Sequence, residues 1–221
     1  MLTKLKLTTF AVAILSFAGS ASASNIVVNG SFEGGTYVGP NGDLVPNGWI
    51  LGPPSSTSDS RLNVDNATDP SVGLGPEDGT NYARFESPAI SGKDCLLQDL
   101  TTVAGMTYQV SFWVGFTSTS VGNNVTFSPI WDEQGGNYVE MTTSLDPPSN
   151  TGPTGYVEYI FNEVASGTTT RIDFHAVDTN GSVLLDNVVV SAVSSTPEPS
   201  TMVIAGSALL AAGLLRRRRK V

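Results

Sequence analysis

The chain has 221 residues and a formal net charge of −9 at pH 7, with 11 Lys and Arg against 20 Asp and Glu. Between residues 24 and 199 only four basic residues accompany all 20 acidic ones. So acidic a region repels phosphate backbones, which excludes nucleic acid as a partner of the folded part. Charged residues make up 14% of the chain, against roughly 25% in an average soluble protein, and the chain has 23 Gly and 13 Pro. This composition favours an all-β extracellular protein.

The N-terminus has the pattern of a secretory signal peptide, which we assign to residues 1–23. Two lysines precede the apolar run at residues 10–17 (FAVAILSF). Ala21 and Ala23 then provide small residues at the two positions that a signal peptidase reads. We expect export and cleavage after Ala23, because the apolar run is short for a retained anchor.

The C-terminus, residues 194–221, has the pattern of a membrane-directed signal. A polar spacer and Pro197-Glu198-Pro199 precede an apolar segment at residues 201–215 and five consecutive basic residues. As a helix the segment would rise only about 22 Å, which makes it a marginal membrane span. The basic cluster would stay on the cytoplasmic side, with the acidic domain outside.

This order of Pro-Glu-Pro, apolar helix and Arg-rich tail resembles the PEP-CTERM sorting signal of Gram-negative bacteria. The resemblance implies recognition by an exosortase that cleaves near Pro197, Glu198 and Pro199. It also implies transit through the inner membrane to the cell surface or extracellular matrix. The alternative is a plain C-terminal anchor that is never cut.

Residues 24–193 read as strands and turns. Alternation is clearest at residues 108–116, where Tyr108, Val110, Phe112, Val114 and Phe116 share one face. No stretch of this region has helical periodicity over 11 residues, and Asn-Gly and Asp-Gly pairs mark turns. The fold class predicted is therefore all-β, an antiparallel β-sandwich in a single domain. Further strands are predicted at residues 81–85, 125–130, 156–161, 171–177 and 183–190, with long loops at 53–75, 117–124 and 132–155.

Cys95 is the one cysteine, so an intramolecular disulfide and a multi-Cys zinc site are excluded. It precedes Leu96 and Leu97, which favours a buried, inert side chain. The alternative is a reactive thiol, but Lys93 is the one nearby basic residue in the sequence that could lower its pKa.

Five short motifs resemble, in order, those of a galactose-binding-like jelly roll, the fold of many carbohydrate-binding modules. The resemblance covers about residues 25–192 and implies a jelly-roll sandwich, with weaker implications for any ligand. The motifs are residues 29–33 (NGSFE), 46–49 (PNGW), 78–83 (DGTNYA), 105–114 (GMTYQVSFWV) and 184–190 (LLDNVVV).

The same resemblance implies a structural calcium ion. It matches Glu33, at the end of a predicted first strand, and Asp186, in the last strand, to ligand carboxylates. It adds the turn that begins at Asp78 and a carbonyl near Ser31, and oxygen ligands of this kind suit Ca²⁺. The alternative for Asp186 is that it caps backbone amides or pairs with a basic residue such as Arg84.

A sugar-binding surface is predicted around Trp113. If Tyr108, Val110 and Phe112 point into the core, Trp113 faces outward beside Gln109 and Ser111. An aromatic plane stacks on sugar rings, and neighbouring amides or carboxylates recognise the sugar hydroxyl groups. His175 shares a face with Arg171 and Asp173 and is expected to point into the same concavity as Trp113. Trp49 is expected to close the core instead. The further sugar-binding candidates are Trp131, Tyr138, Gln134, Asn137, Tyr37 and His175.

Catalysis is not predicted. Every Ser-His-Asp or Cys-His arrangement would need His175, the one histidine, and no G-x-S-x-G or H-E-x-x-H motif occurs. The neighbouring acidic pairs at residues 77–78 and 132–133 are interpreted as solvated turn residues.

The sequence thus favours a non-catalytic exported protein of the cell surface or biofilm matrix, processed by signal peptidase and an exosortase. The alternative is a carbohydrate-binding module that recognises exopolysaccharide, and a polysaccharide-acting hydrolase is a distant third.

Overall fold

The computed structural model describes residues 24–39, 42–52, 62–66, 73–86, 94–117, 125–133, 137–141, 155–178 and 181–193. The predicted signal peptide and the C-terminal sorting segment lie outside these residues, including Ala21, Ala23, Pro197, Glu198 and Pro199. Within the part of the chain that is described, no helix is long and apolar enough to cross a membrane.

The regular secondary structure of the described residues consists of β-strands, as the composition predicts. The strands are β1 (Thr36–Val38), β2 (Leu44–Pro46), β3 (Ile50–Leu51), β4 (Leu62–Asn66), β5 (Asn81–Phe85), β6 (Asp94–Thr101), β7 (Thr107–Phe116), β8 (Val125–Glu133), β9 (Asn137–Glu140), β10 (Tyr156–Val164), β11 (Thr169–Asp178) and β12 (Val183–Ala192).

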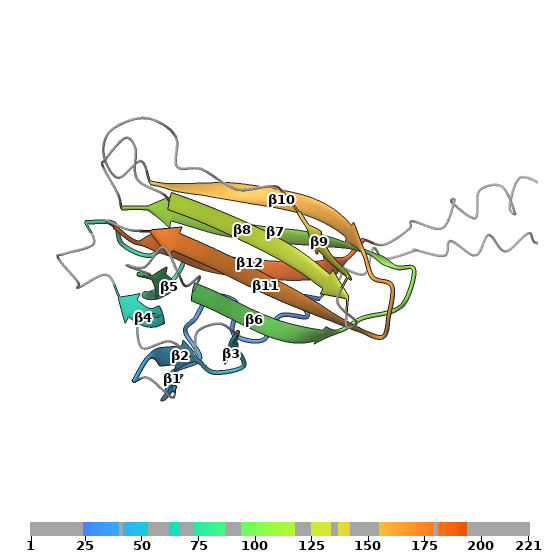
Figure 1. The fold of residues 1–221 in the computed structure, drawn as a ribbon, viewed down its shortest axis with the longest axis horizontal. Coiled ribbons are helices and arrows are strands. Elements are labelled where there is room, and N and C mark those ends of the chain that lie inside the picture. Colours follow the sequence, from blue (N-terminus) through green and yellow to red (C-terminus); the bar gives the residue numbers. More distant parts are fainter. Residues whose placement is uncertain are drawn as a thin grey trace, which may run out of the picture.

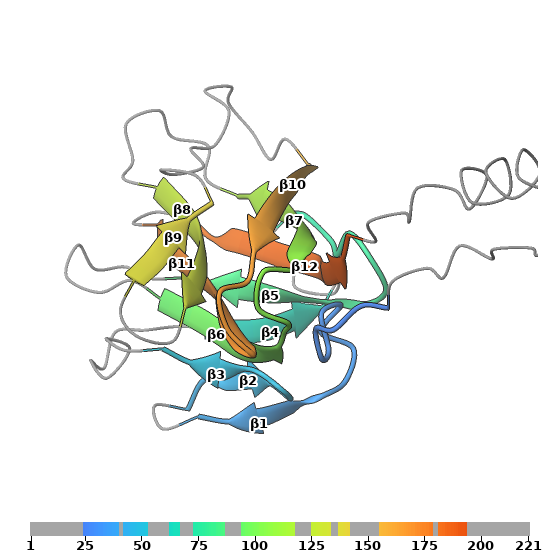
Figure 2. The same ribbon diagram turned by 90° about the vertical axis from the view of Figure 1, so that its right-hand side faces the viewer.

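Two five-stranded antiparallel sheets pack face to face (Figure 1). One has the order β10-β7-β12-β5-β4 and is called the β7 sheet below; the other has the order β3-β6-β11-β8-β9 and is called the β11 sheet. A hairpin of β1 and β2 lies beside β3 (Figure 2). The predicted antiparallel β-sandwich is confirmed.

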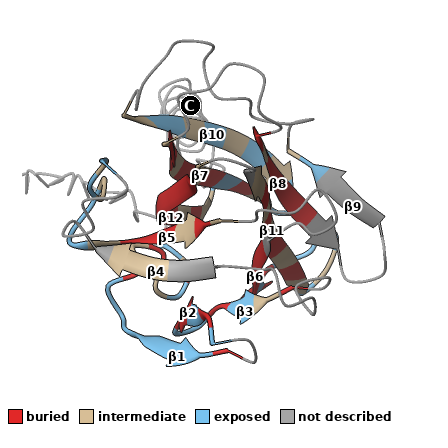
Figure 3. Cartoon of the chain, turned by 60° about the vertical axis from the view of Figure 1, so that its left-hand side comes forward, coloured by how far each residue is buried: buried red, intermediate tan, exposed pale blue. Residues whose placement is uncertain are grey.

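The core lies between the two sheets and is rich in aromatic rings. Phe112 of β7 is fully buried, and its ring centroid lies 5.1 Å from that of Phe174 on β11. Phe127 of β8 contacts both rings, which joins the two sheets. The five alternating residues predicted from Tyr108 to Phe116 are all buried, and Figure 3 shows the buried residues concentrated on the facing strands.

The N-terminal segment closes one side of the sandwich. Ile26 donates its amide to Val190 of β12 at 2.9 Å, and the amide of Val188 donates to Gly30 at 2.8 Å. A side chain at Gly30 would overlap the Val188 carbonyl, which explains a glycine there. Trp49 is buried against Phe32 and Phe174, as predicted for a residue that closes the core.

The strands predicted within residues 81–190 are present, and the structure adds others. β6 lies where no strand was predicted, and β4 and β9 lie within segments predicted to be long loops. Glu33 was predicted to lie at the end of a first strand. That prediction is wrong, because Glu33 lies in a turn.

Strand β10 is an edge of the described β7 sheet, and its inner face carries one charged residue. Glu163 pairs in register with buried Tyr108, on the side of the strand that also carries Tyr159 and Phe161. Burial raises the pKa of this carboxyl.

Candidate functional site

Trp113 lies on the outer face of the β7 sheet. Its neighbours in sequence, Phe112 and Val114, are fully buried in the core, whereas Trp113 itself is half-buried. Because successive side chains of a strand point to opposite faces, the indole is directed away from the core. The predicted outward orientation of Trp113 is therefore confirmed.

Polar and aliphatic side chains of β10 accompany Trp113 on this face. Glu158 pairs in register with Trp113, Ile160 with Ser111, and Asn162 with Gln109. Glu158, Gln109 and Asn162 are exposed, as is Ile160. We call Gln109, Ser111, Trp113, Glu158, Ile160 and Asn162 the Trp113 face. It offers an aromatic plane, two amides, a hydroxyl and a carboxylate, and from Gln109 to Trp113 it spans about 13 Å along the strand.

A small apolar cluster borders the Trp113 face at one end. Tyr82 and Leu184 are fully buried there although they point outward from the sheet, and Leu74 and Tyr156 pack against them. Gly115 allows this packing, since a Cβ there would lie 2.7 Å from Leu74 and 3.3 Å from the Tyr156 ring. The segment at residues 73–80 therefore covers this end of the sheet.

Asp186 of β12 holds that covering segment in place. It pairs in register with Trp113 from the other side and is fully buried. Its Oδ2 accepts the backbone amides of Glu77 at 2.8 Å and Asp78 at 3.0 Å, and its Oδ1 accepts the amide of Asn187 at 2.7 Å. The Asp186 carboxyl thus caps backbone amides, which was one alternative proposed from the sequence. The other was pairing with Arg84, but Arg84 pairs with Asp65 at 2.9 Å and with Glu86.

The ionisation of Asp186 is strongly perturbed by its surroundings. Burial raises its pKa from 3.8 to about 7, the three amide donors oppose that rise, and the charge of Glu77 adds to it. Nearby, burial and the charge of Asp186 raise the pKa of Tyr156 well above its usual value. The Tyr156 hydroxyl is buried and has no hydrogen-bond partner among the described residues.

Glu33 holds the next residues of the same segment. Its Oε1 accepts the backbone amides of Thr80 at 2.6 Å and Asn81 at 2.7 Å, and its Oε2 accepts the Thr80 hydroxyl at 2.7 Å and the Asn81 side-chain amide at 2.8 Å. Desolvation would raise the pKa of Glu33, but these donors together hold it below its usual value.

Two of the residues matched to a calcium site, Glu33 and Asp186, accept hydrogen bonds through their carboxylates. A carboxylate has about four lone-pair sites, and hydrogen bonds use four at Glu33 and three at Asp186. In the described part of the chain Glu33, Asp78 and Asp186 do not form a group with ligand atoms within 4.8 Å of one another. Ser31 is half-buried. Calcium at Glu33 would have to displace hydrogen-bond donors, and the ion remains a prediction.

Two residues predicted to bind sugar do not lie on the Trp113 face. Trp131 is a core residue, 1% exposed, whose indole donates to the Val164 carbonyl at 3.2 Å, so it cannot stack on a ligand. His175 shares a face with Arg171 and Asp173, as predicted, but that face is the outer side of the β11 sheet. The prediction that it shares a concavity with Trp113 is wrong, because the whole core lies between them.

The remaining sugar-binding candidates are placed only in part. The side chains of Tyr138 and Asn137, on β9, and the whole of Gln134 lie outside the described residues. Tyr37 is 42% exposed on the β1–β2 hairpin and donates its hydroxyl to Trp49, away from β7. The residues of β10 that complete the Trp113 face were not predicted, because only the strand pairing identifies them.

Residues 195–220 match the PEP-CTERM protein-sorting motif, which confirms that resemblance. No curated protein matches the chain in sequence.

Among solved structures, the chain is similar to several carbohydrate-binding modules. TmCBM61, solved in complex with β-1,4-galactotriose, is 16% identical with a TM-score of 0.51, covering 77% of this chain and 100% of that one. The CBM22-1 xylan-binding domain of Paenibacillus barcinonensis Xyn10C is 16% identical with a TM-score of 0.50, covering 80% and 100%. The Stig cyclase Fisc from Fischerella sp. TAU is also 16% identical, with a TM-score of 0.55, covering 78% and 98%. The fold is thus the jelly-roll sandwich of carbohydrate-binding modules, and a cyclase has a similar fold.

Proposed function

We propose that this protein is exported, is sorted through residues 195–220, and binds polysaccharide with the Trp113 face as a non-catalytic module. The observation that carries the proposal is the outward position of Trp113 on a largely polar face, on a sandwich similar to carbohydrate-binding modules. The sorting motif supports processing by an exosortase after signal-peptide removal, with transit through the inner membrane to the cell surface or matrix.

The chemistry of the Trp113 face suits a sugar chain. The half-buried indole is held by its flanking strands and offers a flat apolar surface for the C–H groups of a pyranose ring. Gln109 and Asn162, paired across β7 and β10, provide amide donors and acceptors for hydroxyl groups. The Glu158 carboxylate, paired in register with Trp113, can accept hydrogen bonds from sugar hydroxyl groups. A neutral or weakly charged polysaccharide is the expected class, because the acidic chain repels polyanions.

The test is a binding assay with native exopolysaccharide and a panel of purified plant and bacterial polysaccharides. We expect saturable binding by the wild type, and a loss of roughly thirtyfold or more in affinity for Trp113→Ala, as for an aromatic hot spot. Tyr37→Ala is the matched control, since it removes an exposed aromatic ring from the hairpin and leaves the Trp113 face intact. Unchanged binding by a folded Trp113→Ala variant rejects the site.

Sorting and cleavage of the C-terminal segment are tested by mass spectrometry. The mass of the mature protein recovered from the culture medium or cell surface should lack the first 23 residues and the segment after about Pro199. Recovery of a chain that keeps its C-terminal segment supports the plain anchor instead. Assays for reducing-end release separate a binding module from a hydrolase.

A further inference from the structure

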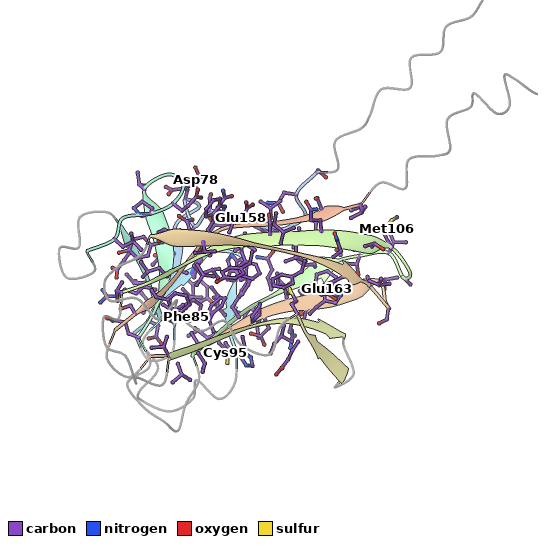
Figure 4. The ribbon with its side chains drawn as sticks, turned by 90° about the horizontal axis from the view of Figure 1, so that it is seen from above. Asp78, Phe85, Cys95, Met106, Glu158 and Glu163 are labelled. Atoms are coloured by element: carbon purple, nitrogen blue, oxygen red, sulfur yellow. The ribbon has the colours of Figure 1, made fainter. Side chains whose placement is uncertain are left out.

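Three metal-ligating side chains of different chemistry meet on the outer face of the β11 sheet, away from the Trp113 face. Cys95 of β6 pairs in register with His175 of β11, and Asp173 lies two residues before His175 on the same side of the strand. A thiol sulfur, a ring nitrogen and a carboxylate oxygen of these residues all lie within 4.8 Å of one another. Figure 4 shows Cys95 on the opposite side of the sandwich from Asp78 and Glu158.

The three residues are shielded but reachable. Cys95 is buried at 1% exposure, whereas the side chains of His175 and Asp173 are 22% and 14% exposed. The His175 Nε2 and the Asp173 Oδ2 are 3.0 Å apart, so the carboxylate orients the imidazole. A cation could therefore reach His175 and Asp173 from solvent.

The other carboxylate oxygen of Asp173 is the second observation that points to a cation. Its Oδ1 is buried and has no hydrogen-bond partner among the described residues. A buried carboxylate oxygen without a donor is costly, and a bound cation would remove that cost. Arg171, on the same face, forms a two-point ion pair with Asp99 at 2.7 and 3.0 Å.

We propose that Cys95, Asp173 and His175 form a binding site for a transition-metal cation, with Zn²⁺ as the expected ion. Thiolate and imidazole ligands favour zinc over calcium or magnesium, and a carboxylate completes a common ligand set. Donor atoms around a tetrahedral zinc lie roughly 3.3–3.7 Å apart, so the observed spacings need only small side-chain rotations. Three protein ligands leave a fourth position for water or an external ligand.

The electrostatics of the site agree with a divalent cation. A thiolate and a carboxylate together balance the charge of Zn²⁺, and the chain around them is strongly acidic. Metal binding releases the proton of the thiol. This site is separate from polysaccharide binding, and neither property depends on the other.

The test uses the full chain, purified in mild detergent and freed of metal, and titrated with Co²⁺ and then Zn²⁺. We expect one Co²⁺ per chain, with a sulfur-to-cobalt charge-transfer band that Zn²⁺ removes by displacement. Cys95→Ser should abolish the band. His175→Gln and Asp173→Asn should each weaken Zn²⁺ binding at least about tenfold, measured by calorimetry.

Asp99→Asn is the matched control, because it neutralises an acidic residue of β6 on the same face outside the three ligands. It should leave Zn²⁺ affinity unchanged. Since Cys95 is buried, its variant is checked for folding by circular dichroism. If Cys95→Ser does not fold, the proposal is tested by the charge-transfer band of the wild type and by the loss of Zn²⁺ affinity in His175→Gln. Absence of the band in the wild type, or Zn²⁺ affinity that His175→Gln does not change, overturns the proposal.

Discussion

The buried carboxyl of Asp186 predicts that the protein becomes less stable as the pH rises toward neutrality. Its pKa is about 7 in the folded state, against an ordinary value of 3.8. Between these values the folded state keeps a proton that the unfolded chain has lost, so the free energy of unfolding falls with increasing pH. The loss ends above about pH 7, where Asp186 is ionised in both states.

The size of the effect follows from the shift. One pKa unit corresponds to 1.36 kcal/mol, so the full shift is worth about 4 kcal/mol, and the interval from pH 5 to pH 7 about 2–3 kcal/mol. The cause is burial of the carboxylate, which the amides of Glu77, Asp78 and Asn187 offset only in part.

The assay compares the wild type with Asp186→Asn by urea unfolding at half-unit steps from pH 5 to pH 8, followed by tryptophan fluorescence. Asn cannot ionise, and its carbonyl can still accept an amide. The stability of the variant relative to the wild type should therefore rise by about 2–3 kcal/mol between pH 5 and pH 7. Groups other than residue 186 cancel in this difference. A difference that stays constant, or that changes in the opposite direction, refutes the assignment of a raised pKa to Asp186.

Three further predictions concern stability. Hydrogen bonds lower the pKa of Glu33 in the folded state. The ionised carboxylate therefore stabilises the fold above the pKa it has in the unfolded chain, and this stabilisation is lost as the pH falls through the folded-state pKa. Thermal unfolding should show that Glu33→Gln loses less stability than the wild type between pH 5 and pH 3. The calcium site implied by resemblance predicts that a chelator lowers the melting temperature by several degrees and that added Ca²⁺ restores it. An unchanged melting temperature, with no calcium found by elemental analysis, contradicts that prediction. Phe112→Ala should cost about 3–5 kcal/mol in urea unfolding, since the ring is fully buried among Phe127 and Phe174; a cost below 1 kcal/mol would show that the ring is not a core contact.

Local alternation predicted the strands whose two faces differ in burial. In β7 the buried residues from Tyr108 to Phe116 alternate with more exposed ones up to Val114, and the strand was recognised. In β6, Cys95 and Leu97 are buried on the outer face and Leu96 and Leu100 on the inner, so the alternation disappears. A strand buried on both sides cannot be told from another apolar run by periodicity.

The candidate sites depended on pairings that a single sequence does not contain. Alternation shows that Trp113 and His175 each point away from the core, but not that they lie on different sheets. The partner of Asp186 is the amide of Glu77, 109 residues away in the chain. Likewise, the sequence alone does not place Cys95 beside His175, because the register of β6 and β11 brings them together.

The inward carboxyl of Glu163 has a consequence for how copies of this protein meet one another. An edge strand exposes unpaired amides and carbonyls on which another chain could add a strand, and the outer side of β10 also exposes Ile160 and Val164. If another chain were added at this edge, the sheet would continue past β10 and enclose Glu163 further from water, at a cost that rises as the carboxyl ionises. An inward-pointing carboxyl on an edge strand thus disfavours the addition of another chain at β10.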